Sequence, residues 1–104
     1  MPVTTISGHS VQVDEEGFLT SYAEWDDELA EALATAIGID LTDEHRSVLS
    51  FLRRDFADRG ETPTLRRVST AGGFATKRLF ELFPKKPAKK MAYIAGLPKP
   101  RGCV

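Results

Sequence analysis

The feature that most limits the fold of this chain is a long amphipathic stretch in its middle. Apolar residues recur there every three or four positions, the spacing that lines one face of a helix. Thr42 is placed to cap the start of this helix, and Gly60 is placed to end it. The apolar positions are Val48, Leu49, Phe51, Leu52 and Phe56. A face of this width needs other elements to cover it, so we expect a mainly helical protein.

Shorter segments on either side of this stretch also carry helical signals. One follows Asp26, a good N-cap, and Gly38 supplies its stop. The other begins at Thr62 and Pro63, as cap and first-turn proline, and Gly72 stops it. The spacing of the middle helix, which Gly60 ends, and the helix that begins at Thr62 resembles a helix-turn-helix, which keeps DNA binding open as an alternative.

Two more helices follow and bring the expected total to about five. The first is short and very apolar, and its aromatic density indicates a place in the core. Pro84 ends it, and Pro87 starts the last helix. The short helix carries Phe74, Leu79, Phe80, Leu82 and Phe83. We predict a small orthogonal helical bundle.

A short β-hairpin is expected at the amino terminus. Apolar and polar residues alternate there around a turn at Ser7, Gly8 and His9. A hairpin alone is marginal in water, so neighbouring apolar residues must pin it to the helices. We expect Phe18, Leu19 and Tyr22 to do so.

The length of 104 residues, 41% hydrophobic and 28% charged, fits one globular domain. We place the helical domain with its hairpin at residues 1–95. Residues 96–104 hold two prolines and two glycines without a helical period, which predicts a flexible arm. No apolar run is long enough to cross a membrane and no signal-peptide pattern is present, so we expect a cytoplasmic protein.

Charge is divided unevenly along the chain. Residues 1–45 contain eleven Asp and Glu and no Lys or Arg, whereas all 14 Lys and Arg lie in residues 46–104. Such asymmetry is typical of a surface for nucleic acid or an acidic partner. The alternative is that the two halves fold together and partly neutralise each other. Lys85, Lys86, Lys89 and Lys90 oppose the dipole of the last helix, which favours a role facing an anion.

The chain has one cysteine, Cys103, next to its last residue. Its place on the predicted arm indicates exposure, and a mobile thiol can exchange sulfur inside a partner's cleft. Lys99 and Arg101 favour the reactive thiolate, whereas the carboxylate of Val104 opposes it. An incidental cysteine on a loose tail is the alternative.

We expect no metal site, no cofactor and no stand-alone catalyst. One cysteine and two distant histidines do not provide a metal-binding set. His9 lies in the predicted turn and His45 in the first turn of a predicted helix, so neither is placed as a general base.

The last quarter of the chain resembles the DsrC/TusE family of small sulfur-relay proteins. The resemblance rests on the run from Arg78 to Lys89, the run from Ile94 to Pro100, and the penultimate Cys103. Weaker agreement covers residues 14–19, the Trp25 region and residues 41–56. The stretch from 69 to 77 looks shorter than in TusE-like relatives.

The resemblance implies a hairpin on a helical bundle with a flexible arm, and it makes Cys103 the sulfur-carrying cysteine. TusE-type proteins receive sulfur as a persulfide and pass it to a tRNA 2-thiouridylase. DsrC proper has a second cysteine eleven positions upstream, where this chain has Ala92. The single cysteine is therefore the TusE-like pattern.

The leading hypothesis is a sulfur carrier that acts as a cosubstrate. Cys103 would take up sulfane sulfur, with Lys99 and Arg101 favouring its charged form. The other lysines, Lys85, Lys86, Lys89 and Lys90, would dock an acidic partner or tRNA. Two alternatives are a DsrC-like partner of dissimilatory sulfite reductase and a sulfur-responsive DNA-binding regulator.

Overall fold

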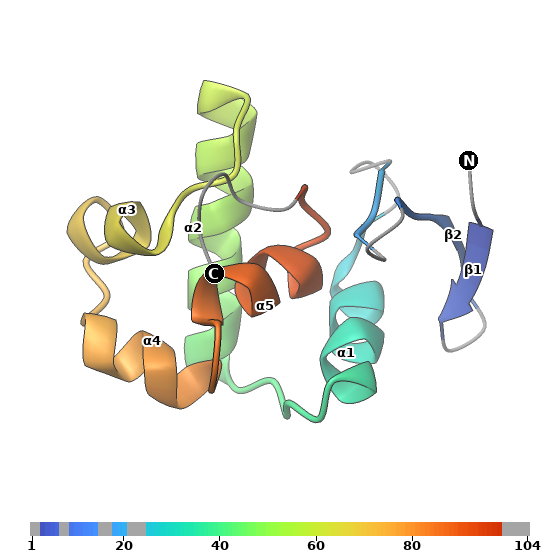
Figure 1. Cartoon of the computed structure of the whole chain (residues 1–104), viewed down its shortest axis with the longest axis horizontal. Coiled ribbons are helices and arrows are strands. Elements are labelled where there is room, and N and C mark those ends of the chain that lie inside the picture. Colours follow the sequence, from blue (N-terminus) through green and yellow to red (C-terminus); the bar gives the residue numbers. More distant parts are fainter. Residues whose placement is uncertain (1–2, 7–8, 15–17, 21–24, 99–104) are drawn as a thin grey trace.

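The computed structural model describes residues 3–6, 9–14, 18–20 and 25–98, with residues 3–6, 9 and 10 described by their backbone alone. Within this part of the chain lie two strands followed by five helices (Figure 1). The strands are β1 (Val3–Ile6) and β2 (His9–Gln12). The helices are α1 (Asp27–Ala36), α2 (Asp43–Arg59), α3 (Leu65–Thr70), α4 (Thr76–Leu82) and α5 (Pro87–Ile94). The prediction of a mainly helical protein is confirmed.

The two strands form an antiparallel hairpin, as predicted. Val3 pairs with Gln12, and Ile6 pairs with His9. His9 is therefore the first residue of β2 rather than part of the turn. Leu19 packs with apolar residues of α1, and Phe18 is also buried, whereas Tyr22 lies outside the described residues. The small cluster beside α1 consists of Val11, Val13, Leu19, Leu29 and Leu33.

Helix α2 begins and ends where its sequence signals predict. The Thr42 hydroxyl accepts a hydrogen bond from the backbone N–H of His45, and Gly60 ends the helix in the left-handed conformation. The His45 ring is buried. Its Nδ1 accepts from the backbone N–H of Thr42, and its Nε2 donates to the carbonyl of Leu82 at 2.8 Å. His45 therefore ties the start of α2 to the end of α4.

Helix α5 lies at the centre of the bundle. It packs against α1, α2 and α4, and Figure 1 shows it running across α2 with α1 on its other side. Its buried residues are Pro87, Ala88, Met91, Ala92 and Ile94. Ala88, Met91 and Ile94 join the main core, to which all five helices contribute. The end of α5, from which the terminal segment starts, is consequently held on several sides.

Two local predictions are corrected by the structure. Helix α3 begins at Leu65 with Thr64 as its N-cap, so Pro63 precedes the helix instead of starting it. Phe80, which we assigned to the core, is 48% exposed. Helix α4 buries the face of Leu79 and Leu82, and consecutive positions of a helix differ by about 100° around its axis. Phe80 therefore turns away from the core.

No described helix has both the length and the apolar character needed to cross a membrane. Among the described residues, no group of three His, Cys, Asp or Glu side chains is placed to hold a metal ion.

Candidate functional site

The residues assigned to sulfur chemistry lie beyond the described part of the chain. Cys103, Lys99 and Arg101 are all outside the described residues. The structure does describe the segment from which they follow, Ile94 to Pro98, which we call the arm root. The packed body extends into this segment, because Gly96 and Leu97 are buried and Pro98 is the first exposed residue.

The arm root starts with a Schellman motif at the end of α5. The Leu97 N–H donates to the carbonyl of Ala92 at 3.0 Å, and the Gly96 N–H donates to that of Tyr93 at 3.2 Å. Gly96 adopts a φ of +71°, a backbone conformation that L side chains rarely take. Leu97 then inserts into the main core, with no exposed surface. The direction in which the chain leaves α5 is fixed by these contacts.

Three side chains from distant parts of the chain bind the carbonyls of the arm root. The Trp25 indole N–H donates to Ile94 at 2.8 Å, and the Arg53 guanidinium donates to Ala95 at 2.6 Å. The Thr62 hydroxyl donates to Pro98 at 2.7 Å. These donors come from the residue before the N-cap of α1, from α2, and from the loop after α2. The arm root therefore touches three separate elements of the body.

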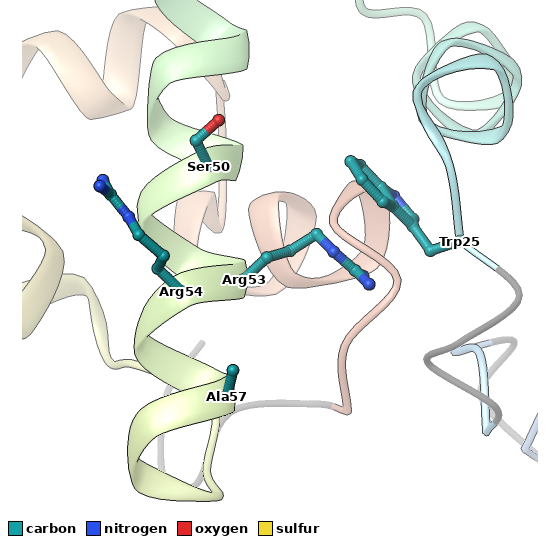
Figure 2. A pocket seen from close by; sticks show the side chains of 5 residues that line it. All are labelled: Trp25, Ser50, Arg53, Arg54 and Ala57. Atoms are coloured by element: carbon teal, nitrogen blue, oxygen red, sulfur yellow. The ribbon is translucent and has the colours of Figure 1, made fainter.

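Trp25 and Arg53 also pack on each other. The Arg53 guanidinium carbon lies 4.1 Å from the centre of the Trp25 ring, a cation–π contact, and Figure 2 shows Arg53 reaching from α2 toward this ring. A Cβ at Gly96 would lie 2.5 Å from Cδ1 of Trp25, so only glycine allows this close approach.

A surface hollow of about 580 Å³ opens beside this pair. Residues of α2 and Trp25 surround it, and Figure 2 shows Ser50, Arg54 and Ala57 along the helix. Arg53 and Arg54 make its lining cationic. The hollow thus lies between Trp25 and the face of α2 that carries both arginines.

Asp55 fixes the last turns of α2, which lead to Thr62. Its carboxylate is 7% exposed and accepts two hydrogen bonds from Arg67 of α3, at 2.9 and 2.7 Å. Arg59 adds a third contact at 3.5 Å. The hydrogen bonds from Arg67 hold the pKa of Asp55 below its ordinary value, outweighing the desolvation that would raise it.

The predicted docking lysines lie in the loop after α4 and in the first turns of α5. Lys85 and Lys86 are exposed, whereas Lys89 and Lys90 are only half-exposed. The Lys90 ammonium group donates a hydrogen bond to the carbonyl of Pro84. Lys90 therefore holds the loop in place and also adds positive charge beside it. The structure therefore brings these four lysines together at one end of α5, with two of them less exposed than expected.

None of the three side chains that bind the arm root, Trp25, Arg53 and Thr62, is predicted from the sequence to do so. A signal for Arg53 exists in the amphipathic pattern of α2. Arg53 follows Leu49 by four positions and precedes Phe56 by three, so it is a cation beside the apolar face. Thr62 carries no comparable signal. The residues around it indicate only a helix cap, and nothing in them points to the carbonyl of Pro98.

A family described as "DsrC like protein" matches residues 5–104 of this chain. A solved structure, the oxidized gamma-subunit of the dissimilatory sulfite reductase (DsrC) from Archaeoglobus fulgidus, superposes with a TM-score of 0.81 at 38% identity. That superposition covers 99% of this chain and 100% of the other. The match therefore includes the arm root.

Two curated relatives carry different names. The dissimilatory-type sulfite reductase subunit gamma of Nitratidesulfovibrio vulgaris is 39% identical over 105 residues, which covers 100% of both chains. The sulfurtransferase TusE of Salmonella typhimurium is 36% identical over 104 residues, which covers 93% of this chain and 95% of the relative.

Proposed function

This chain belongs to the DsrC-like protein family, and on that premise we propose that it carries sulfane sulfur as a persulfide on Cys103. Similarity over nearly the full length to a sulfurtransferase is the observation that carries the proposal. The chain has a single cysteine, so one thiol is available for sulfur chemistry. The protein would be a cosubstrate that works in the cytoplasm between a donor and an acceptor.

The uptake step is an exchange at sulfur. The Cys103 thiolate attacks the terminal sulfur of a donor persulfide, R–S–SH, so that a new S–S bond forms on Cys103 and the donor's S–S bond breaks. The products are Cys103–S–SH and the donor thiolate R–S⁻. The proton stays on the transferred sulfur, and no external oxidant or reductant is needed. Delivery repeats the exchange, with an acceptor thiolate as the attacking group.

The arm root supports this function by giving the arm a defined starting point. Pro98 is held by Thr62, and Cys103 follows it by five positions in the sequence. Five residues span at most about 18 Å when fully extended. A partner that receives sulfur from Cys103 therefore has to approach the body near the arm root.

Two groups of cations would assist the exchange, one next to Cys103 in the sequence and one at the start of α5. We propose that Lys99 and Arg101, which lie outside the described residues, favour the anionic sulfur. Lys85, Lys86, Lys89 and Lys90 would bind the acidic surface of a partner, or tRNA held by that partner. The acceptor in this proposal is a tRNA 2-thiouridylase.

A second candidate is a partner of dissimilatory sulfite reductase. The full-length match to the gamma subunit from Nitratidesulfovibrio vulgaris favours it. With Ala92 eleven positions upstream of its only cysteine, however, the chain cannot close an intramolecular disulfide. It would have to serve such an enzyme with one thiol. DNA binding by the basic half stays an untested prediction.

The proposal is tested by the intact mass of the chain after exposure to a sulfur donor. The reduced protein is incubated with a cysteine desulfurase relay and free cysteine. We expect one sulfur per chain, an added mass of about 32 Da, that disappears after treatment with a thiol reductant. Cys103→Ser should gain no mass. No added sulfur on a wild-type chain that still reacts with iodoacetamide would overturn the proposal.

The acceptor is tested by presenting the loaded chain to two enzymes. One is a tRNA 2-thiouridylase with its tRNA, and the other is the sulfite reductase of Nitratidesulfovibrio vulgaris freed of its gamma subunit. Loss of the added sulfur only to the first supports our choice of acceptor. Loss only to the second would favour the alternative.

A further inference from the structure

We propose that the exposed end of α4 and the loop after it form a docking surface for an acidic protein, with Phe80 as its apolar anchor. The inference rests on the proposed function, because this protein would be one that exchanges sulfur with Cys103. We call the surface the Phe80 patch. It consists of Lys77, Phe80, Pro84, Lys85 and Lys86, all of which are exposed.

Phe80 is the one large hydrophobic side chain in the described part of the chain that stands in solvent, at 48% exposure. Lys77 lies three positions before it on the same face of α4, and Pro84 lies four positions after it. An aromatic group surrounded by polar residues has the anatomy of a protein interface, in which a central aromatic contributes much of the binding energy.

The lysines of the Phe80 patch have no acidic partner among the described residues. Lys77, Lys85 and Lys86 form no ion pair there. The neighbouring Arg78, by contrast, binds Glu44 through two hydrogen bonds at 2.7 and 2.6 Å and contacts Glu81 at 3.2 Å. The nearby acids are thus already engaged by Arg78. The charge left over is positive, so the complementary partner is acidic.

The backbone of the loop is held in an unusual shape that presents these lysines. Lys85 and Lys86 have φ values of +58° and +45°, which are costly for side chains with a Cβ. Lys90 holds the loop from the other side through the carbonyl of Pro84, and its own N–H donates to the carbonyl of Lys86 at 3.2 Å. Costly conformations of this kind persist where the surroundings enforce them, often at functional sites.

The chemistry of the Phe80 patch favours a protein over RNA as the occupant. Recognition of phosphates commonly uses unpaired arginine forks, whereas the arginine in this helix, Arg78, is already paired with two carboxylates. A protein with an apolar recess inside an acidic rim fits Phe80 and the lysines together.

The test places a photoreactive benzoylphenylalanine at position 80 of the full chain, in the cells that naturally make it. A second chain carries the same group at Thr70, an exposed position of α3. After irradiation, we expect a protein adduct at position 80 that is absent at position 70. Lys77→Glu should lower its yield about ten-fold, as expected for a hot-spot neighbour. Arg66→Glu, an equal change of charge at an exposed site on α3, should leave the yield unchanged.

Support further requires that the captured protein, once purified, exchange sulfur with loaded Cys103. Phe80→Ala should then raise the concentration of that protein at half-maximal transfer, without changing the maximal rate. An adduct with RNA, a yield that Lys77→Glu and Arg66→Glu lower equally, or no adduct above that at position 70 would overturn the inference. The emission of Trp25, the single tryptophan, checks that each variant is folded.

The failure of this inference is distinguishable from failure of the proposed function. If Cys103 gains sulfur but position 80 captures no protein, the function stands and the Phe80 patch is wrong. If position 80 captures a protein in a charge-dependent way but Cys103 gains no sulfur, the Phe80 patch binds an acidic protein, but the carrier role is wrong and that protein is not a partner in sulfur exchange.

Discussion

Asp55 illustrates how single residues set the stability of the body that carries the arm. It is a nearly buried carboxylate that receives two hydrogen bonds from Arg67 and a longer contact from Arg59. Both arginines keep part of their side chains in water, which weakens the pair relative to a fully buried one. The carboxylate nonetheless depends on them, because an unpaired charge at this position would be costly.

Asp55→Asn should destabilise the protein by roughly 2–3 kcal/mol, measured by urea unfolding at pH 7. The pKa of Asp55 is lowered in the folded state, so its contribution is complete above the unfolded pKa of about 4 and is lost as the pH falls through the folded pKa. The difference between wild type and Asp55→Asn should therefore shrink below about pH 4. Asp58→Asn, at an exposed position of the same helix, should change stability by less than about 0.5 kcal/mol. A wild-type-to-Asp55→Asn difference that stays constant down to pH 2 would contradict this account.

Lys86→Gly should stabilise the protein by about 0.5–1 kcal/mol. Glycine adopts a φ of +45° without the cost that Lys86 bears, and this gain exceeds its greater loss of backbone entropy. Lys89→Gly, inside α5, is the matched control and should lose about 1 kcal/mol. The measurement is the free energy of unfolding from urea titration. If both variants lose stability equally, the backbone at Lys86 is not strained.

At the scale of elements, the arm root joins the end of α5 to the rest of the fold. Its carbonyls are bound by Trp25 before α1, Arg53 in α2 and Thr62 after α2. Each contact spans many positions in the sequence, so it forms only when the bundle has assembled. The start of the arm is therefore a product of the whole tertiary structure.

Gly96→Ala should disturb the arm root in two ways. It places a Cβ at a φ of +71° and 2.5 Å from Trp25, so the indole must shift. Gly38→Ala is the matched control, since its φ is +76° but nothing lies within 4 Å of the added Cβ. We expect Gly38→Ala to cost about 1–2 kcal/mol and Gly96→Ala to cost more, with a change in Trp25 emission only for the latter. Equal costs and unchanged emission would show that the contact with Trp25 is unimportant.

Local signals in the sequence predict the helices and strands, whereas they do not predict the contacts between residues that are far apart in the sequence. Thr42, Gly60 and Pro87 act within one helical turn, so their roles were predictable. The bond from Arg53 to Ala95 joins residues 42 positions apart, and no local pattern specifies it. Phe80 was misplaced because an aromatic side chain suggests burial, while a helix of seven residues is too short to fix its apolar face. The role proposed for Cys103 rests on the family resemblance, because this residue lies outside the described part of the chain.

In the whole molecule, part of the uneven charge distribution along the chain serves to hold the fold together. Arg46 pairs with Asp27 and Glu31, and Arg78 pairs with Glu44, so cations of the second half neutralise acids of the first. The lysines of the Phe80 patch take no part in these pairs. Among the described residues, Arg46 and Arg78 thus hold the fold, whereas Lys77, Lys85 and Lys86 are exposed, where a partner would find them.

If this chain carries sulfur between two other proteins, a single-turnover transfer will detect the sulfur first on this chain and then on the acceptor. Cys103 is loaded with radiolabelled sulfur, the donor is removed, and an acceptor enzyme is added in excess. We predict that the label leaves the chain and appears on the acceptor or its product, one sulfur for each chain. Label that stays on Cys103, or that leaves only as free sulfide at the rate seen without acceptor, would contradict the account.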